Sequence, residues 1–278
     1  MALLLGVLVA ITYGSSDFFG GLAMRQAPVG ATLLWTQAIG LVALLVVALG
    51  AGGSPSAGDL ALGALAGLAG GAGIGCLYRG LSIGRASVVA PISAVGAATL
   101  QVAWGLVRGE DPGALALCGV ALALVAIGVV AGTAGDDSDR PASRRDEVLL
   151  GGAAAILLGV FIIMFSETGS NSGLWPAVCA RAAPIPVLLI LLPLLRQPVT
   201  VGRAALGVVA TAGVLDATAN ALLLVALREG LLSLVAPVAA LYPASTVVLS
   251  RFVLNERLGR ARMAGLGVAL IGLILIGL

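Results

Sequence analysis

Long apolar runs recur along the whole chain, separated by short polar or glycine-rich stretches. Each run holds about twenty residues, the length that a helix needs to cross the hydrocarbon core of a bilayer. A membrane β-barrel would instead show segments of about ten residues with alternating polarity, and these runs do not alternate. We therefore expect an all-α polytopic membrane protein with ten transmembrane helices. The expected spans are residues 2–22, 29–50, 59–78, 86–107, 113–133, 148–167, 173–195, 204–227, 231–252 and 259–278.

The composition excludes several classes of protein. Of the 278 residues, 60% are hydrophobic and 10% are charged, whereas an ordinary soluble domain has about 25% charged residues. Polar side chains are too few to cover a water-facing surface, which excludes a soluble enzyme and a disordered scaffold. All 15 basic residues are Arg and there is no His, so no basic stripe exists and we expect no nucleic-acid partner. The three cysteines are far apart, so we expect no disulfide framework, metal or cofactor.

The chain consists of two related halves. Residues 84–91 and residues 230–237 share the pattern G-x-x-S-x-V-A-P. The two segments are 146 residues apart, and the same offset pairs Glu110 with Glu256, in the turn that follows each of these spans. Each of these carboxylates has an Arg close by in sequence, and local capping or a local salt bridge explains it adequately. The predicted organisation is a five-helix repeat over 1–134, a charged linker over 135–147 and a second five-helix repeat over 148–278.

An odd number of spans in each repeat has a geometric consequence. The second copy enters the membrane from the opposite side and is therefore inverted, so that a two-fold axis in the membrane plane relates the halves. Inverted repeats are the architecture of alternating-access transporters, which bind their substrate near the midplane where the halves meet. We expect a central cavity between the two bundles.

The repeated residues also resemble a known family. The V-A-P motif in both halves, the Gly109-Glu110 and Asn255-Glu256 turns and the segment Tyr13–Gly21 are similar to those of the EamA-type family of the drug/metabolite transporter superfamily. This resemblance implies ten helices around a cavity lined by spans 1–4 and 6–9, with spans 5 and 10 at the periphery. It also implies transport, commonly export, of small metabolites.

Two arguments about membrane orientation disagree. Connections after odd-numbered spans hold twelve of the Arg residues, and connections after even-numbered spans hold Arg108 and Arg228. The positive-inside rule therefore favours both termini outside the cell. The family resemblance implies both termini in the cytoplasm, and the orientation stays open.

Ionisable side chains within the spans are functional candidates, because each costs about 2.5–3.5 kcal/mol to insert at mid-membrane. Asp216 lies near the centre of its span, and Asn220 follows four residues later on the same helical face. Asp216 is a candidate proton site or contact for a substrate amine. Alternatively, it is a structural carboxylate paired with Arg181. Arg181 is itself a candidate for binding a substrate carboxylate, and Gln37 is its counterpart in the first half.

Two further carboxylates lie nearer the ends of their spans. Asp17 belongs to span one and Glu167 closes span six. A carboxylate near each end of the cavity suits a proton-coupled gate, although acids at half-exposed helix ends are common.

Prolines and aromatic residues add candidates for gating and binding. Pro91, Pro237 and Pro243 interrupt the hydrogen bonding of spans four and nine and are candidates for gating kinks. Tyr242, Tyr78 and Trp104 are candidates for ring contacts with a substrate.

Span three carries a row of small residues. Gly63, Gly67, Gly71 and Gly75 recur every four residues, which indicates close helix packing on one face. The expected neighbour is span four or span nine.

Together these features predict a secondary active transporter that is not an enzyme. It exports a small organic metabolite by alternating access, with protons as candidate coupling ions. A lipid-linked carrier or flippase of the same fold is the alternative, and an intramembrane enzyme is a weaker one because zinc-protease chemistry needs His. The expected partners are a small-molecule solute and the lipid bilayer, and the protein is a monomer or homodimer. The use of Arg in place of Lys favours a bacterial cytoplasmic (inner) membrane.

Overall fold

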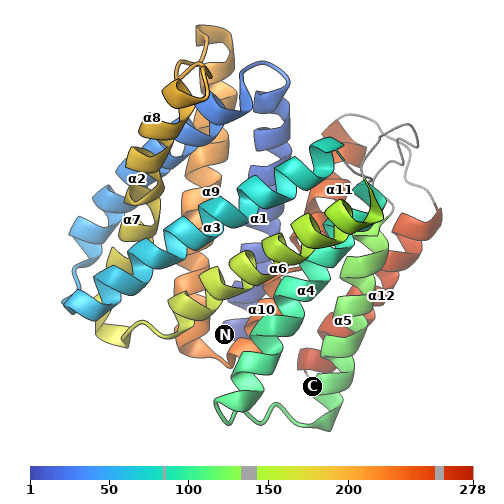
Figure 1. The fold of residues 1–278 in the computed structure, drawn as a ribbon. Coiled ribbons are helices and arrows are strands. Elements are labelled where there is room, and N and C mark those ends of the chain that lie inside the picture. The colour runs from blue at the N-terminus through green and yellow to red at the C-terminus, as the bar shows by residue number, and fades with distance from the viewer. Residues whose placement is uncertain (84–85, 133–142, 254–259, 278) are drawn as a thin grey trace.

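The computed structural model describes residues 1–83, 86–132, 143–253 and 260–277, and every regular element in them is helical (Figure 1). Most of the predicted linker, together with Glu256, lies outside the described residues. The elements are α1 (Ala2–Met24), α2 (Val29–Ala51), α3 (Ala57–Ile83), α4 (Ala86–Val107), α5 (Ala114–Gly132), α6 (Arg144–Ser166), η1 (Ser170–Ser172), α7 (Trp175–Ala182), α8 (Pro184–Leu194), α9 (Arg203–Glu229), α10 (Leu232–Ala239), α11 (Tyr242–Val253) and α12 (Arg260–Gly277).

The helices have the length and surface of membrane spans. Within the described residues, seven helical segments are long and apolar enough to cross a bilayer, and three shorter apolar segments accompany them. Large apolar side chains such as Val46, Ile190 and Leu194 are mostly exposed, which suits a surface that faces lipid. The multi-pass, all-helical prediction is confirmed, and the count of ten crossings stays a prediction.

Two of the predicted spans are interrupted. Residues 173–195 form α7 and α8, which meet at Pro184, and residues 231–252 form α10 and α11. Pro184 has no backbone N–H, so the carbonyl one turn earlier loses its helical partner.

The second interruption does not lie at the repeated proline. Pro91 lies inside α4 and Pro237 inside α10, and both of these helices continue past their proline. α10 ends at Ala239, and α11 begins again just before Pro243. The helix break in span nine therefore belongs to Pro243.

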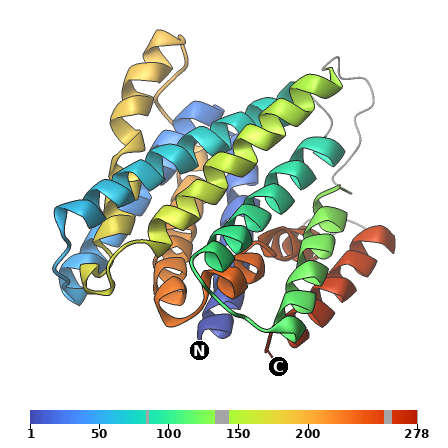
Figure 2. The ribbon, with the colours of Figure 1, turned by 60° about the horizontal axis from the view of Figure 1, so that its bottom comes forward.

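The packing of the helices has the symmetry that two repeats require. α1 packs along α9, and the equivalent helices of the other half, α6 and α3, pack along each other. In the same way α2 contacts α9, and α7 contacts α3. α5 packs against its counterpart α12 at one edge of the molecule, as Figures 1 and 2 show. Each half therefore completes its core with helices of the other half.

Hydrogen bonds between connections define the two ends of the bundle. At one end, here called the Glu110 end, the carboxylate of Glu110 accepts hydrogen bonds from the backbone N–H groups of Leu232 and Ser233, both at 2.8 Å. At the other end, called the Arg25 end, α1 passes into α2, and the indole Nε1 of Trp35 donates to the carbonyl of Val199 at 3.0 Å. Glu110 therefore caps a helix, which is one of the two expectations for it, but the helix belongs to the other half, so the expectation of a local contact is wrong.

The two halves are inverted relative to each other. Ala2, at the start of α1, lies against Gly230 at the Glu110 end. Glu167, directly after α6, forms an ion pair of 3.1 Å with Arg108, which follows α4 at the same end. α1 therefore begins where its counterpart α6 finishes, and the two run in opposite directions, as the odd span count predicts.

The main apolar core lies toward the Glu110 end. Leu223 and Leu224, near the end of α9, are fully buried. They belong to one cluster with Phe165 at the end of α6, Val235 at the start of α10 and Leu44 of α2. This end of the bundle is closed by packed side chains.

The glycine row of α3 packs against α7, so the expectation of span four or nine as its neighbour is wrong. A Cβ atom on Gly63 or Gly67 would collide with the backbone of Pro176 or Ala180, respectively. Gly71 faces Pro184 at 3.7 Å, whereas a Cβ on Gly75 would have no described atom within 4 Å. The sequence marks a face for close packing, but the neighbour depends on the tertiary arrangement.

Candidate solute-binding site

A cavity of about 530 Å³ lies between the two halves. Its lining comes from α1, α2, α3, α4, α6, α7, α9, α10 and α11, and no residue of α5 or α12 takes part among those described. This matches the arrangement that the family resemblance implies, with spans 5 and 10 at the periphery. The volume is in the range of small-molecule sites.

The cavity occupies the half of the bundle that leads to the Arg25 end. On α1 its lining runs from Tyr13 to Met24, the last residue of the helix. On α3 the lining runs from Gly67 to Leu81, also toward that end. No described residue of α1 before Tyr13 takes part. The cavity therefore approaches the Arg25 end, and the apolar core separates it from the Glu110 end.

The structure brings the predicted binding residues together. Most of the predicted candidates line this one cavity, whereas Pro91, Pro237, Gly63, Gly75, Trp104 and Glu167 do not. The candidates that line it are Asp17, Gln37, Gly67, Gly71, Tyr78, Arg181, Asp216, Asn220, Tyr242 and Pro243.

Arg181 of α7 is the centre of a buried polar cluster. It is 4% exposed, forms an ion pair with Asp216 of α9 and donates a hydrogen bond of 2.9 Å to Oε1 of Gln37 on α2. Burial of a guanidinium is tolerated when its charge is paired and its N–H groups are bonded. Gln37 and Arg181 are repeat counterparts, so their direct contact places the cluster close to the pseudo-two-fold axis.

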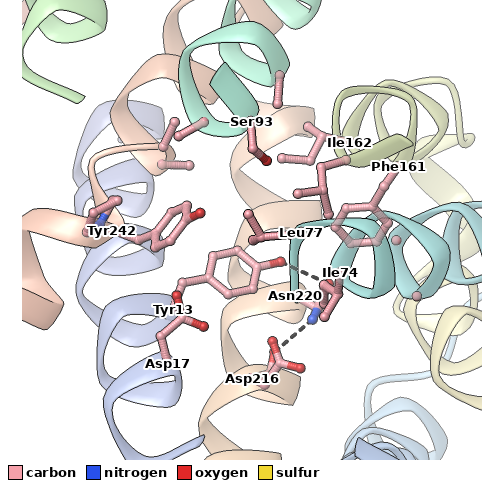
Figure 3. Close-up of a pocket in the computed structure, with 18 of the residues that line it drawn as sticks. Tyr13, Asp17, Ile74, Leu77, Ser93, Phe161, Ile162, Asp216, Asn220 and Tyr242 are labelled. Atoms are coloured by element: carbon pink, nitrogen blue, oxygen red, sulfur yellow. Dashed lines mark hydrogen bonds between the residues drawn. The ribbon is translucent and has the colours of Figure 1, made fainter. Parts of the chain in front are cut away.

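Tyr13 and Asn220 extend this cluster across the cavity (Figure 3). The Tyr13 hydroxyl donates to Oδ1 of Asn220 at 3.0 Å. The Asn220 amide in turn donates to the backbone carbonyl of Asp216 at 2.8 Å, one helical turn earlier. This arrangement joins α1 of the first half to α9 of the second.

Asp17 lies one turn after Tyr13 on α1 and is exposed to the cavity. Among the described residues, no hydrogen bond or ion pair reaches its carboxylate. The ring of Tyr242 packs edge-on against that of Tyr13, with centroids 6.4 Å apart. Asp17 and these rings form one wall of the cavity.

Two predicted residues belong to the Glu110 end instead. Glu167 pairs with Arg108 and accepts a hydrogen bond of 2.9 Å from the indole Nε1 of Trp104. Glu167 thus behaves as an acid at a half-exposed helix end, the alternative given above for it, and neither Glu167 nor Trp104 lines the cavity.

Two polar residues of α4 belong to the lining that sequence reasoning missed. Ser93 and Gln101 are each 2% exposed, and Oε1 of Gln101 has no hydrogen-bond partner within the described chain. A buried polar atom without a partner carries a free-energy penalty. The signal was present, because Gln101 interrupts an apolar run in the same way as Gln37.

No group of three or more acidic or cysteine side chains in the described ranges gathers in the way that a metal site requires. The polar groups of the cavity are hydrogen-bond donors and acceptors, and among the described ones three, Asp17, Arg181 and Asp216, are acidic or basic.

The fold and the site together define a class of protein. Two inverted helical bundles around a central cavity that holds a buried polar cluster are the architecture of alternating-access carriers. The EamA-like transporter family matches the chain over residues 1–132 and 147–278, one match in each half. The chain therefore belongs to the EamA-like transporter family.

Comparison with solved structures agrees with this fold. One crystal structure, described only as that of a protein, is similar with a TM-score of 0.79. The similarity covers 100% of this chain and 98% of the other, at 16% sequence identity. No curated protein matches the chain.

Proposed function

We propose that the protein is a secondary active transporter that exports a small organic metabolite across a bacterial cytoplasmic membrane by alternating access. The observation that carries the proposal is a cavity with a buried polar cluster between two inverted halves, with a packed core between it and one end of the bundle. A carrier of this kind binds its solute from one side and releases it to the other when the halves change their relative tilt.

The cluster of Arg181, Asp216 and Gln37 suits a point about which the halves rock. It lies close to the pseudo-two-fold axis and joins α2, α7 and α9. The interrupted span α10–α11 adds a hinge candidate, because Pro243 lies both beside the helix break and in the cavity wall.

The size of the cavity favours a soluble metabolite over a lipid-linked cargo. A volume of about 530 Å³ accommodates a compact molecule, whereas a long-chain lipid carrier would need a wide lateral opening between helices. The protein works as a monomer or homodimer with protons as the candidate coupling ions, and Asp216 is the carboxylate that we assign to them.

Reconstitution into proteoliposomes with a pH-sensitive dye in the lumen tests this proposal. A thermal-shift screen of amino acids, polyamines, sugars and cationic drugs first supplies solutes that bind. We expect Asp216→Asn to abolish solute-dependent proton movement, because Asn keeps an oxygen for Arg181 but does not ionise. The protein should still elute as a folded species.

Asp111→Asn is the matched control. Asp111 is an exposed carboxylate that accepts a hydrogen bond from Gly113 at the Glu110 end, outside the cavity, and its variant should match the wild type. Unchanged proton movement with Asp216→Asn would remove Asp216 from the coupling. A wild-type protein that moves none of the bound solutes would contradict the transport proposal itself.

A further inference from the structure

The charges that line the cavity do not cancel. Among the described lining residues, three side chains carry a formal charge: Asp17, Arg181 and Asp216. Arg181 and Asp216 neutralise each other in their ion pair. Asp17 has no such partner, so the wall around it carries one net negative charge.

The positive charge in the cavity is already neutralised within the protein. Arg181 is almost fully buried, and its Nη1 atom binds Asp216 and Gln37. A solute carboxylate or phosphate would meet this neutralised guanidinium and, in addition, the carboxylates of Asp216 and Asp17. The electrostatics of the cavity therefore disfavour an anion.

Two tyrosine rings of the lining, those of Tyr13 and Tyr242, lie on the side of the cavity where Asp17 lies (Figure 3). The chain has three tyrosines, and all of them line this cavity. Tyr13 lies one helical turn before Asp17, and Tyr242 packs against Tyr13 (Figure 3). Tyr78, from α3, lines the same cavity as Asp17. The negative faces of aromatic rings attract cations, most strongly when the site excludes water.

Two neutral polar residues of α4 in the lining suit a solute without an acidic group. Ser93 offers a hydroxyl, and Gln101 offers a carbonyl oxygen without a partner. Both are neutral, and most of the other lining residues are apolar, such as Ile74, Leu77 and Phe161. The cavity thus combines one free carboxylate, tyrosine rings and an apolar surround.

We propose that the solute is a monovalent organic cation, an alkylated amine or quaternary ammonium compound, whose cationic nitrogen lies between Asp17 and the rings of Tyr13, Tyr78 and Tyr242. This inference rests on the proposed transport function and names its substrate class. The apolar part of the solute then contacts the apolar lining residues Ile74, Leu77 and Phe161.

Binding to the purified full chain tests the inference with two probes of nearly equal shape. Choline carries a quaternary ammonium, and 3,3-dimethylbutan-1-ol replaces its nitrogen by carbon and is neutral. We expect choline and the larger benzyltrimethylammonium to bind and to raise the melting temperature, and the neutral alcohol to bind at least tenfold more weakly. Equal binding of choline and the neutral alcohol would overturn the inference.

Substitutions locate the bound cation. Asp17→Asn should weaken choline binding at least tenfold while the protein keeps its melting temperature in the absence of ligand, and Asp111→Asn should leave the binding unchanged. Tyr78→Leu should weaken the binding more than Tyr78→Phe, because Phe keeps the aromatic face. Binding that is insensitive to Asp17→Asn, or equal losses from both Tyr78 variants, would contradict the assigned position.

Transport assays separate the two proposals. If the proteoliposomes move a neutral or anionic solute and no cationic one, the substrate class is wrong and the transport function stands. If cations bind at Asp17 and none crosses the membrane, the site stands and the transport function fails.

Discussion

The Glu110 end and the Arg25 end of the bundle differ in how they are filled. At the Glu110 end, Leu223, Phe165 and Val235 form a packed apolar core. Toward the Arg25 end, the same bundle encloses a cavity whose lining reaches Met24 and Leu81. One end is therefore closed by side chains, and the other holds the space for a solute.

The difference between the two ends can be interpreted through the internal symmetry of the chain. The two halves are inverted copies, so the axis that relates them also exchanges the two ends. The asymmetry is what the proposed alternating access requires of one state. The proposal then predicts a second conformation in which the Glu110 end holds the cavity and the Arg25 end is packed.

The largest expected effect is all-or-none and tests whether the two ends face opposite sides of the membrane. In a background in which Cys76, Cys118 and Cys179 are replaced by Ser, single cysteines are placed in exposed connections at each end. Gln26→Cys and Thr200→Cys mark the Arg25 end, and Ser54→Cys and Ser170→Cys mark the Glu110 end. We expect a membrane-impermeant maleimide to label the two pairs from opposite sides.

The same labelling experiment decides the orientation. The Arg distribution predicts that the Arg25 end is cytoplasmic, whereas the family resemblance predicts that the Glu110 end is. Labelling of all four positions from one side would contradict the inverted repeat, and the carrier mechanism with it.

A smaller effect tests the packing contrast along a single helix. Gly63 and Gly75 belong to the same glycine row of α3, but Gly63 touches the backbone of Pro176, whereas Gly75 faces open space within the described structure. We expect Gly63→Ala to destabilise the protein by about 1–3 kcal/mol, since overpacking against the backbone forces the helices apart.

Gly75→Ala is the matched control, because it adds the same methyl group and the same helix propensity. It should leave the melting temperature unchanged or raise it. Melting temperatures of the two purified variants in detergent provide the comparison. An equal loss of stability in both would mean that the row packs along its whole length.

Much of the fold is encoded in features that a sequence displays directly. Span length depends on bilayer thickness, and the expected spans 2–22 and 29–50 differ from α1 and α2 by two residues or fewer at each end. The repeat is visible as an offset between identical residues. Most of the polar cavity residues were found by one rule, that polar side chains inside an apolar run face away from lipid.

The remainder depends on tertiary contacts that no local pattern contains. The neighbour of Gly63 is set by how α7 lies across α3, and the partner of Glu110 is 122 residues away in sequence. The break in span nine falls at Pro243, whereas α10 continues through Pro237, because a proline removes one hydrogen bond but does not determine whether neighbouring helices hold the chain straight.

The contact of Glu110 with α10 makes a small contribution to keeping the Glu110 end closed. Its carboxylate accepts two backbone hydrogen bonds at the N-terminus of α10, where a negative charge and capping oxygens together contribute about 1–2 kcal/mol. Equivalent positions occur in the other repeat: Glu256 corresponds to Glu110, and Ala86 and Ser87 correspond to Leu232 and Ser233. We expect Glu110→Gln to weaken the closed Glu110 end while the helices stay intact, because the amide oxygen replaces only part of this interaction.

The rate at which a cysteine at a buried position of the Glu110 end is labelled measures how often that end opens. Ala236 is fully buried near the start of α10, and Ala236→Cys in the cysteine-free background should react slowly with maleimide. Since 1.4 kcal/mol corresponds to a factor of ten in an equilibrium, Glu110→Gln should increase the labelling rate by up to about tenfold. Asp111→Gln, which changes the neighbouring carboxylate that does not touch α10, should leave the rate unchanged. Equal rates with and without Glu110→Gln would mean that the apolar core alone keeps this end closed.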